Sequence, residues 1–114
     1  MPQKSSRSQL PYLVFSTTST KKEADHLGHI LVREQRAACV NVVYPVESFF
    51  RWKGKVEKVR EALLVIKTTL DQVPHIEKLI QKHHSYNVPE VIAWPIRRGT
   101  LNYLAWLKSC VKAD

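Results

Sequence analysis

The stretch that decides the fold spans residues 38–66 and reads ACVNVVYPVESFFRWKGKVEKVREALLVI. Alternate residues from Ala38 to Trp52 are almost all apolar, and this period of two predicts a long strand with one apolar face. Pro45 lies in the middle of that strand and has no N–H to donate to a ladder. We therefore expect an edge, a bulge or a kink at Pro45.

The second half of the stretch predicts the return strand of a hairpin. Lys53 and Gly54 form a tight-turn signal, and residues 56–68 follow as a third strand that ends in a buried apolar run. A two-residue turn places Glu47 opposite Arg60, which is a favourable cross-strand pair. One long hairpin is therefore predicted near the centre of the chain.

The flanking segments alternate between strand and helix patterns. A helix over residues 21–36 has a fitting N-cap in Thr20, or in Ser19 before it, and gathers Ala24, Leu27 and Leu31 on one side. The other predicted segments are a strand over 12–18, a helix over 71–84, a loop over 85–89, a strand over 90–96 and a helix over 101–112. This order, β-α-β-β-α-β with a C-terminal helix, is the ferredoxin-like α+β arrangement, with two helices on one face of a four-stranded sheet. We expect a flexible tail over residues 1–10 and one domain over residues 11–114.

The predicted hairpin is too long for the body of the domain. Residues 38–51 would extend about 46 Å as a strand, whereas a compact chain of this size has a radius of gyration of about 13 Å. The hairpin must overhang the body and expose apolar side chains such as Tyr44, Phe50 and Trp52, together with unpaired strand edges. Association with identical subunits would cover both, so an oligomer is expected, although this argument does not give the number of copies.

Composition narrows the location and the partners. The chain has no apolar run of about 20 residues, as a membrane span requires, and the polar residues 1–9 carry no signal-peptide pattern. We expect a cytoplasmic protein in which Cys39 and Cys110 are reduced. The net charge of +8 invites a nucleic-acid role. Residues 56–68, however, lack the aromatic side chains that stack bases in RNA-recognition domains, so we expect no nucleic-acid binding.

Five segments closely resemble one protein family. In chain order they read AACVNV (37–42), SFFRWKGKVE (48–57), LVIKT (64–68), HSYNVPEVIA (84–93), and Gly99 followed by YLAWL (103–107). With these segments, the chain resembles the CutA divalent-cation tolerance proteins over about residues 12–108.

The resemblance implies a homotrimer similar in architecture to the PII signalling proteins, with long hairpins that pair across subunits. It also implies a link to tolerance of copper and other divalent metals, and no catalytic activity. Three positions depart from the family pattern. Ser16 stands where some relatives carry a cysteine thought to bind copper, and Ser85 and Asn87 replace the proline and glutamate of the usual His-Pro-Tyr-Glu.

The resemblance also suggests two kinds of site. His84 matches the family histidine and Glu90 is close to it in sequence, so these two are candidate ligands for Cu(II) or another divalent cation; no other cofactor is implied. The alternative is an intersubunit cleft that binds a small-molecule effector, as in a PII-like signalling trimer. The residues expected to line that cleft, beside Glu90, are Trp52, Lys67, Tyr86, Tyr103 and Trp106.

For three other histidines the sequence favours a role other than metal binding. His83 continues the apolar stripe of Ile76 and Ile80, so we expect it to be packed and hydrogen-bonded. His26 and His29 share one helix face with three basic side chains, which would repel a cation. A solvated helix surface is therefore expected there.

Overall fold

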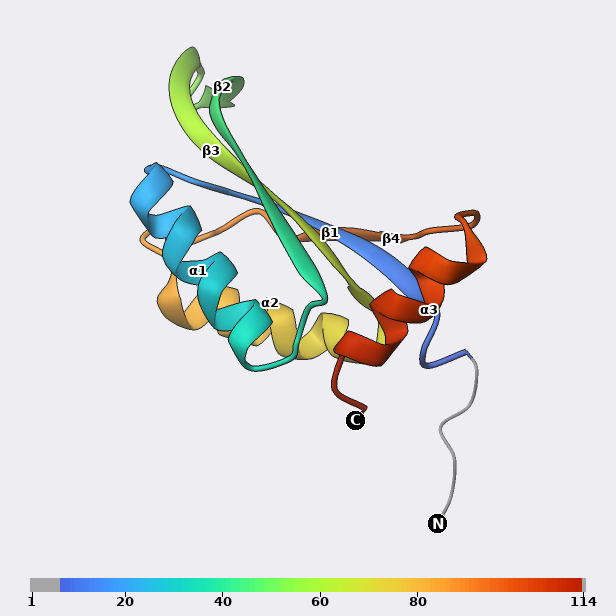
Figure 1. Ribbon diagram of the computed structural model, residues 1–114. Helices are drawn as coiled ribbons and strands as arrows, with labels where there is room; N and C mark the ends of the chain where they lie inside the picture. The colour runs from blue at the N-terminus through green and yellow to red at the C-terminus, as the bar shows by residue number, and fades with distance from the viewer. Residues whose placement is uncertain (1–6, 114) are drawn as a thin grey trace.

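The computed structural model describes residues 7–113, which form a four-stranded antiparallel sheet and three α-helices (Figure 1). The strand order β2-β3-β1-β4 confirms the predicted ferredoxin-like α+β fold. The elements are β1 (Pro11–Thr18), α1 (Lys21–Arg33), β2 (Cys39–Trp52), β3 (Lys55–Thr69), a 3₁₀ turn η1 (Leu70–Gln72), α2 (Val73–His83), β4 (Ile92–Pro95) and α3 (Leu101–Cys110).

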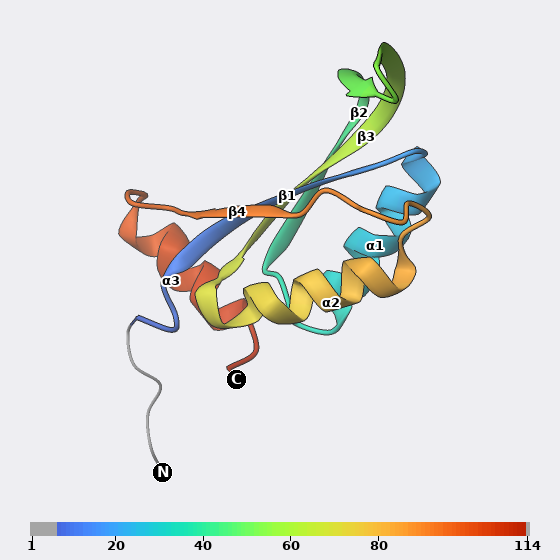
Figure 2. The same ribbon diagram turned by 180° about the vertical axis from the view of Figure 1, so that it is seen from behind.

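Helices α1 and α2 lie side by side on one face of the sheet, and α3 lies at the end of the sheet where β1 begins (Figures 1 and 2). As predicted, α1 starts at the N-cap Thr20, whose hydroxyl accepts a 3.1 Å hydrogen bond from the Glu23 N–H. It ends at Arg33, earlier than the predicted residue 36, because Gln35 takes a positive φ of 60° that cannot continue the helix.

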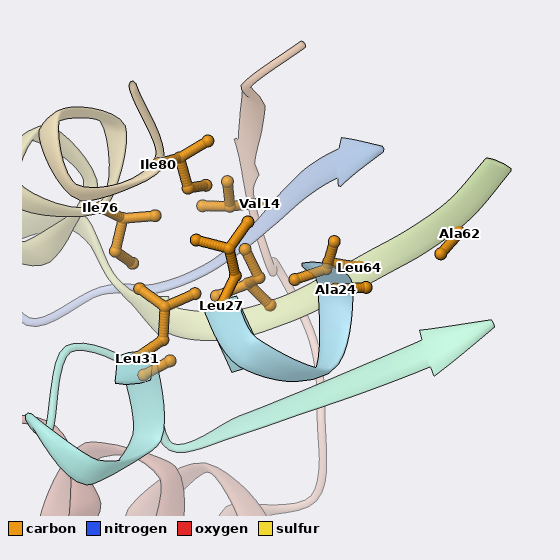
Figure 3. Packing of buried hydrophobic residues seen from close by; sticks show 10 residues of the cluster. Val14, Ala24, Leu27, Leu31, Ala62, Leu64, Ile76 and Ile80 are labelled. Carbon is orange, nitrogen blue, oxygen red and sulfur yellow. The ribbon is translucent and has the colours of Figure 1, made fainter. Parts of the chain in front are cut away.

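The core lies between the sheet and the helices α1 and α2. Its fully buried side chains meet from both layers (Figure 3) and include Val14, Leu27, Leu31, Leu64, Ile66, Ile76 and Ile80. Close contact between α1 and β2 depends on a glycine, since a Cβ on Gly28 would lie 3.3 Å from Val40 Cγ1. This core packs α1 and α2 against the sheet.

Strand β2 contains a bulge at Tyr44 and Pro45, one of the three irregularities expected there. Val43 pairs with Leu63, but the next paired residue, Val46, faces Glu61, so two residues oppose one. The prediction of a single apolar face along β2 is therefore wrong. The extra residue moves Val46 and the alternate residues beyond it to the face of the sheet opposite the helices.

The hairpin overhangs the body of the domain, as its length predicts. Strand β1 pairs with β3 only between Ala62 and Thr69, so residues 55–61 of β3 pair with β2 alone. The hairpin projects from the body in both views (Figures 1 and 2), and the longest dimension of the chain is 53 Å. Its turn is the predicted one, with positive φ at Lys53 and Gly54, and Glu47 faces Arg60.

Buried Gln72 ties the C-terminal segment of the chain to the body. Its Oε1 accepts a 2.9 Å hydrogen bond from Arg36, and its Nε2 donates to the carbonyl oxygen of Lys112 at 2.6 Å. Of the tail predicted over residues 1–10, residues 1–6 lie outside the described part. In the remainder, the carbonyl oxygens of Ser8 and Leu10 accept hydrogen bonds from the backbone at the start of η1.

Candidate functional site

A cleft of about 830 Å³ lies at the root of the projecting hairpin. Three carboxylates line the cleft: Glu57 and Glu61 come from β3, and Glu90 comes from the loop before β4. The remaining lining residues are Thr17, Ser48, Phe49, Phe50, Trp52, Val59, Tyr86 and Val88. Among the described residues that line this cleft there is no basic side chain, although the whole chain has a net charge of +8. The cleft is therefore an acidic and aromatic surface on a basic protein.

The bulge in β2 is what brings aromatic side chains to the cleft. Beyond the bulge, Ser48 pairs with Val59 and Phe50 with Glu57, so these side chains share a face with Glu61. Without the extra residue they would point to the helix side of the sheet. Trp52 lies next to the turn on the same face and is 60% exposed.

Glu61 and Tyr86 form the floor of the cleft. Glu61 is only 6% exposed, and one of its carboxylate oxygens accepts a 2.8 Å hydrogen bond from the Tyr86 hydroxyl. Burial, this hydrogen bond and the charges of Glu61 and Glu23 together raise the pKa of Tyr86 to about 12. The phenol therefore stays protonated and donates to the buried carboxylate over the whole physiological pH range.

His84 lies beneath Tyr86, with ring centroids 4.9 Å apart, and both of its ring nitrogens have protein partners. Its Nε2 lies 2.7 Å from the carbonyl oxygen of Thr17, and its Nδ1 accepts a 3.0 Å hydrogen bond from the Tyr86 N–H. Since a carbonyl oxygen can only accept, Nε2 carries the proton and the ring is the neutral tautomer. His84 thus joins the loop after α2 to β1.

Glu23 fixes the same loop from the side of α1. Its carboxylate accepts hydrogen bonds from the Ser85 N–H at 2.7 Å and from the Ser85 hydroxyl at 3.0 Å. Ser85 therefore supplies a side-chain donor where the family pattern has proline. The start of the loop that carries Tyr86 and Glu90 is therefore held against both β1 and α1.

The predicted site residues fall into two groups. Trp52, Tyr86 and Glu90 line the cleft, whereas Lys67, Tyr103 and Trp106 do not. The Lys67 ammonium lies 5.7 Å from the centroid of the Tyr103 ring, which in turn is 5.5 Å from that of Trp106. Lys67 is six residues beyond Glu61 on β3, a separation of about 20 Å along the strand, so one chain does not bring the two groups together.

The structure gives the two predicted metal ligands, His84 and Glu90, different surroundings. Glu90 faces the cleft, but the lone pair of His84 Nδ1 is already used by the Tyr86 N–H, and Nε2 is a donor. Within residues 7–113, no three or more His, Cys, Asp and Glu side chains are grouped so that they could hold a metal ion. A single chain in this conformation therefore does not offer a ready-made metal centre at His84.

Sequence reasoning missed Glu57, Glu61 and Phe50 as cleft residues. The one available signal was Glu61 itself, a charged residue that directly precedes the buried run 62–66. A buried carboxylate needs a partner, but the sequence alone could not identify Tyr86, 25 positions away, as that partner. The prediction that His83 is packed is also wrong: α2 ends there, His83 is exposed, and His84 turns inward on extended backbone instead.

The strand order, the overhanging hairpin and the cleft at its root define a ferredoxin-like α+β protein. A family model described as "CutA1 divalent ion tolerance protein" matches residues 12–110. The chain belongs to this CutA1 divalent ion tolerance family, which confirms the resemblance carried by the five segments.

Individual relatives agree with this assignment. The chain is 38% identical over 96 residues to the divalent-cation tolerance protein CutA of Thermus thermophilus, covering 84% of this chain and 93% of the relative. It is 40% identical over 100 residues to the chloroplastic protein CutA 1 of Oryza sativa, covering 88% of this chain but only 56% of that relative. The chain thus spans little more than half the length of this plant relative.

Solved structures share the fold. The crystal structure of CutA1 from Oryza sativa superposes with a TM-score of 0.89 at 38% identity, covering 94% of this chain and 99% of the other. None of the α-helices in the described part of the chain combines the length and the apolar character needed to cross a bilayer.

Proposed function

We propose that this chain acts as a non-catalytic, homotrimeric protein of the cytoplasm in the response to divalent cations. Membership of the divalent ion tolerance family supports the cation response. The observation that carries the proposed assembly is the hairpin, since its outer half has no neighbour from β1 and exposes Phe49 by 66% and Trp52 by 60%. Covering apolar surface of this kind is a strong driving force for association.

Mass measurement by light scattering on a size-exclusion column tests the assembly. We expect a mass three times that of the 13.2 kDa chain. Substitution of Trp52→Ser should shift the protein toward smaller species, whereas the matched change Val32→Ser, at an exposed apolar side chain of α1, should not. A monomeric wild type would refute the trimer. Cell fractionation tests the cytoplasmic location, because the rice relative is named chloroplastic.

The binding part of the proposal places a ligand in the cleft. For a divalent cation, Glu90 supplies an exposed carboxylate, and His84 becomes a ligand if Tyr86 N–H releases Nδ1. Carboxylate and imidazole are both good ligands for Cu(II). In an assembly, a neighbouring copy can add further ligands at the mouth of the cleft.

Titration of the protein with Cu(II) tests this metal site. His84→Ala and Glu90→Gln should each weaken binding at the cleft, while Lys67→Ala, outside the cleft, should leave it unchanged. Equal Cu(II) binding by wild type, His84→Ala and Glu90→Gln would remove both residues from the proposal.

A second candidate function is the binding of a small organic cation as an effector, in the manner of a PII-like signalling trimer. The specific support is the cleft lining, which combines three carboxylates with four aromatic side chains. Carboxylates attract an ammonium or guanidinium group, and aromatic faces bind its charge and its apolar body. A thermal-shift screen with alkylamines and arylguanidines should find stabilisation that Glu57→Gln abolishes and Lys67→Ala does not. Stabilisation by metal ions alone would favour the first function.

A further inference from the structure

Two histidines from different helices meet on the outer surface of the domain. His26 lies in the second turn of α1, and His83 is the last residue of α2. Their ring centroids are 5.9 Å apart with the planes at 75°, and both residues are exposed. We propose that His26 and His83 together bind one transition-metal ion, with Cu(II) preferred, in a site that bridges the two helices and is separate from the cleft.

The distance between the rings suits a shared ion. A metal bound to an imidazole nitrogen at about 2 Å lies about 3 Å from the ring centroid. Two rings on one ion can therefore be up to about 6 Å apart between centroids, and less when the bond angle at the metal is smaller. The observed 5.9 Å reaches this range without backbone movement, and rotation of two exposed side chains sets the final angle.

The spacing between the two histidines is held by contacts on both sides. Glu23, one turn before His26, accepts two hydrogen bonds from Ser85, two residues after His83. His84, next to His83, is buried and bonded to Thr17 and Tyr86. These bonds fix the end of α2 against α1, so the two imidazoles are presented as a pair before a metal arrives. A site prepared in this way avoids much of the ordering cost of binding.

The local charges have opposing effects. Lys22 lies one turn before His26, and Lys82 directly precedes His83, so two ammonium groups on long flexible side chains flank the pair. Against them, the last carbonyl groups of α2 point toward its C-terminus and give that end a partial negative charge. Asp25 adds a carboxylate beside His26, in a 2.8 Å ion pair with Lys21. Imidazole binds a transition metal by donating a lone pair, a bond that such exposed ammonium groups weaken without preventing.

This site can hold an ion with two protein ligands. Water completes the coordination of an exposed site, so the lack of a third His, Cys, Asp or Glu ligand within residues 7–113 limits the affinity and does not remove the site. The Irving–Williams order places Cu(II) above Ni(II) and Zn(II) for nitrogen ligands. None of the residues that form this pair lines the cleft, so the inference stands apart from the proposed function.

Titration of the tag-free protein with Cu(II), with electron paramagnetic resonance to count nitrogen ligands, tests the pair. Wild type should show, besides any ion bound at the cleft, one ion per chain that is held by two imidazole nitrogens. His26→Ala and His83→Ala should each lower the affinity at least about tenfold. The double variant should lose less affinity than the sum of the two single losses, because both ligands serve one ion. The control His29→Ala, an exposed histidine on the same helix, should bind as wild type does.

Two outcomes would overturn the inference. The first is unchanged Cu(II) affinity in both His26→Ala and His83→Ala, with circular dichroism showing that the variants are folded. The second is a loss in His29→Ala as large as that in His26→Ala, which would mean unspecific binding to surface imidazoles. Glu90→Gln separates this site from the cleft: it should leave the two-nitrogen signal intact, and loss of that signal in Glu90→Gln but not in His26→Ala would assign the copper to the cleft and refute the pair.

Discussion

The hydroxyl of Tyr86 donates a 2.8 Å hydrogen bond to the carboxylate of Glu61, which is almost fully buried at the root of the hairpin. The two residues are 25 positions apart, one on β3 and the other in the loop after α2. This bond satisfies a carboxylate that would otherwise be costly to bury. It also ties the loop that carries Glu90 to the strand that carries the projecting hairpin.

Removal of the Tyr86 hydroxyl group should destabilise the protein. Tyr86→Phe keeps the ring but leaves Glu61 without its donor, and we expect a loss of about 1–3 kcal/mol in the free energy of unfolding. Urea denaturation of the variant and of wild type measures it. The double variant Tyr86→Phe/Glu61→Gln should recover part of the loss, because a neutral amide is cheaper to bury than a carboxylate. Equal stability of Tyr86→Phe and wild type would mean that a water molecule replaces the hydroxyl group as the hydrogen-bond donor to Glu61.

Stability at high pH should depend on Tyr86. Its pKa is raised from 10.0 to about 12, so the folded protein holds the phenol proton more tightly than the unfolded chain does. The stabilisation is fully present below pH 10.0 and is lost as the pH rises toward 12. Wild type should therefore lose more stability over this interval than Tyr86→Phe.

Absorbance titration of the phenolates gives an independent check on the same group. One of the four tyrosines should ionise well after the others. Tyr86→Phe should remove that late step, and its persistence in the variant would assign the late step to another tyrosine.

Substitution of His84 should be far more costly than substitution of its neighbour. His84→Ala removes the bond to the Thr17 carbonyl and the acceptor for the Tyr86 N–H, and we expect a loss of at least about 2 kcal/mol. His83→Ala changes an exposed side chain and should stay within about 0.5 kcal/mol of wild type. Thermal or urea unfolding compares the two. Similar losses in both variants would contradict the inward position of His84.

A larger side chain at position 28 should force α1 away from β2. A Cβ on Gly28 already lies 3.3 Å from Val40 Cγ1, so Gly28→Val should cost about 1–3 kcal/mol through overpacking. Val40→Ala makes room, and the double variant should be more stable than the sum of the two single losses implies. Strictly additive losses in urea unfolding would show that the two side chains do not compete for the same space.

Local chemistry explains which parts of the fold could be predicted. The turn at Lys53 and Gly54, the facing of Glu47 and Arg60, and the Thr20 cap each depend on residues close in sequence or on a short fixed register, and all three are confirmed. The course of β2 beyond Pro45 could not be predicted in the same way. An alternating pattern does not reveal that one extra residue changes the face to which later side chains point.

The candidate site was harder to predict because it depends on pairing across the chain. Trp52 and Tyr86 do lie at one cleft, but Lys67 is displaced from them along β3, where its ammonium contacts Tyr103. The partnership of His26 with His83 arises from the packing of α1 against the end of α2. Neither spacing nor composition indicates that these two side chains meet, since the two histidines are 57 positions apart in the sequence.

The bulge at Tyr44 and Pro45 divides one strand between two tasks. Residues of β2 before it, such as Val42, pack toward the helices, while residues after it, such as Phe50, belong to the projecting arm. Mutations before this boundary should change the stability of the domain, and mutations after it should change the surface that the projecting arm presents. The outer arm can therefore be exchanged or redesigned as a module, giving new contacts to a domain whose interior is left as it was.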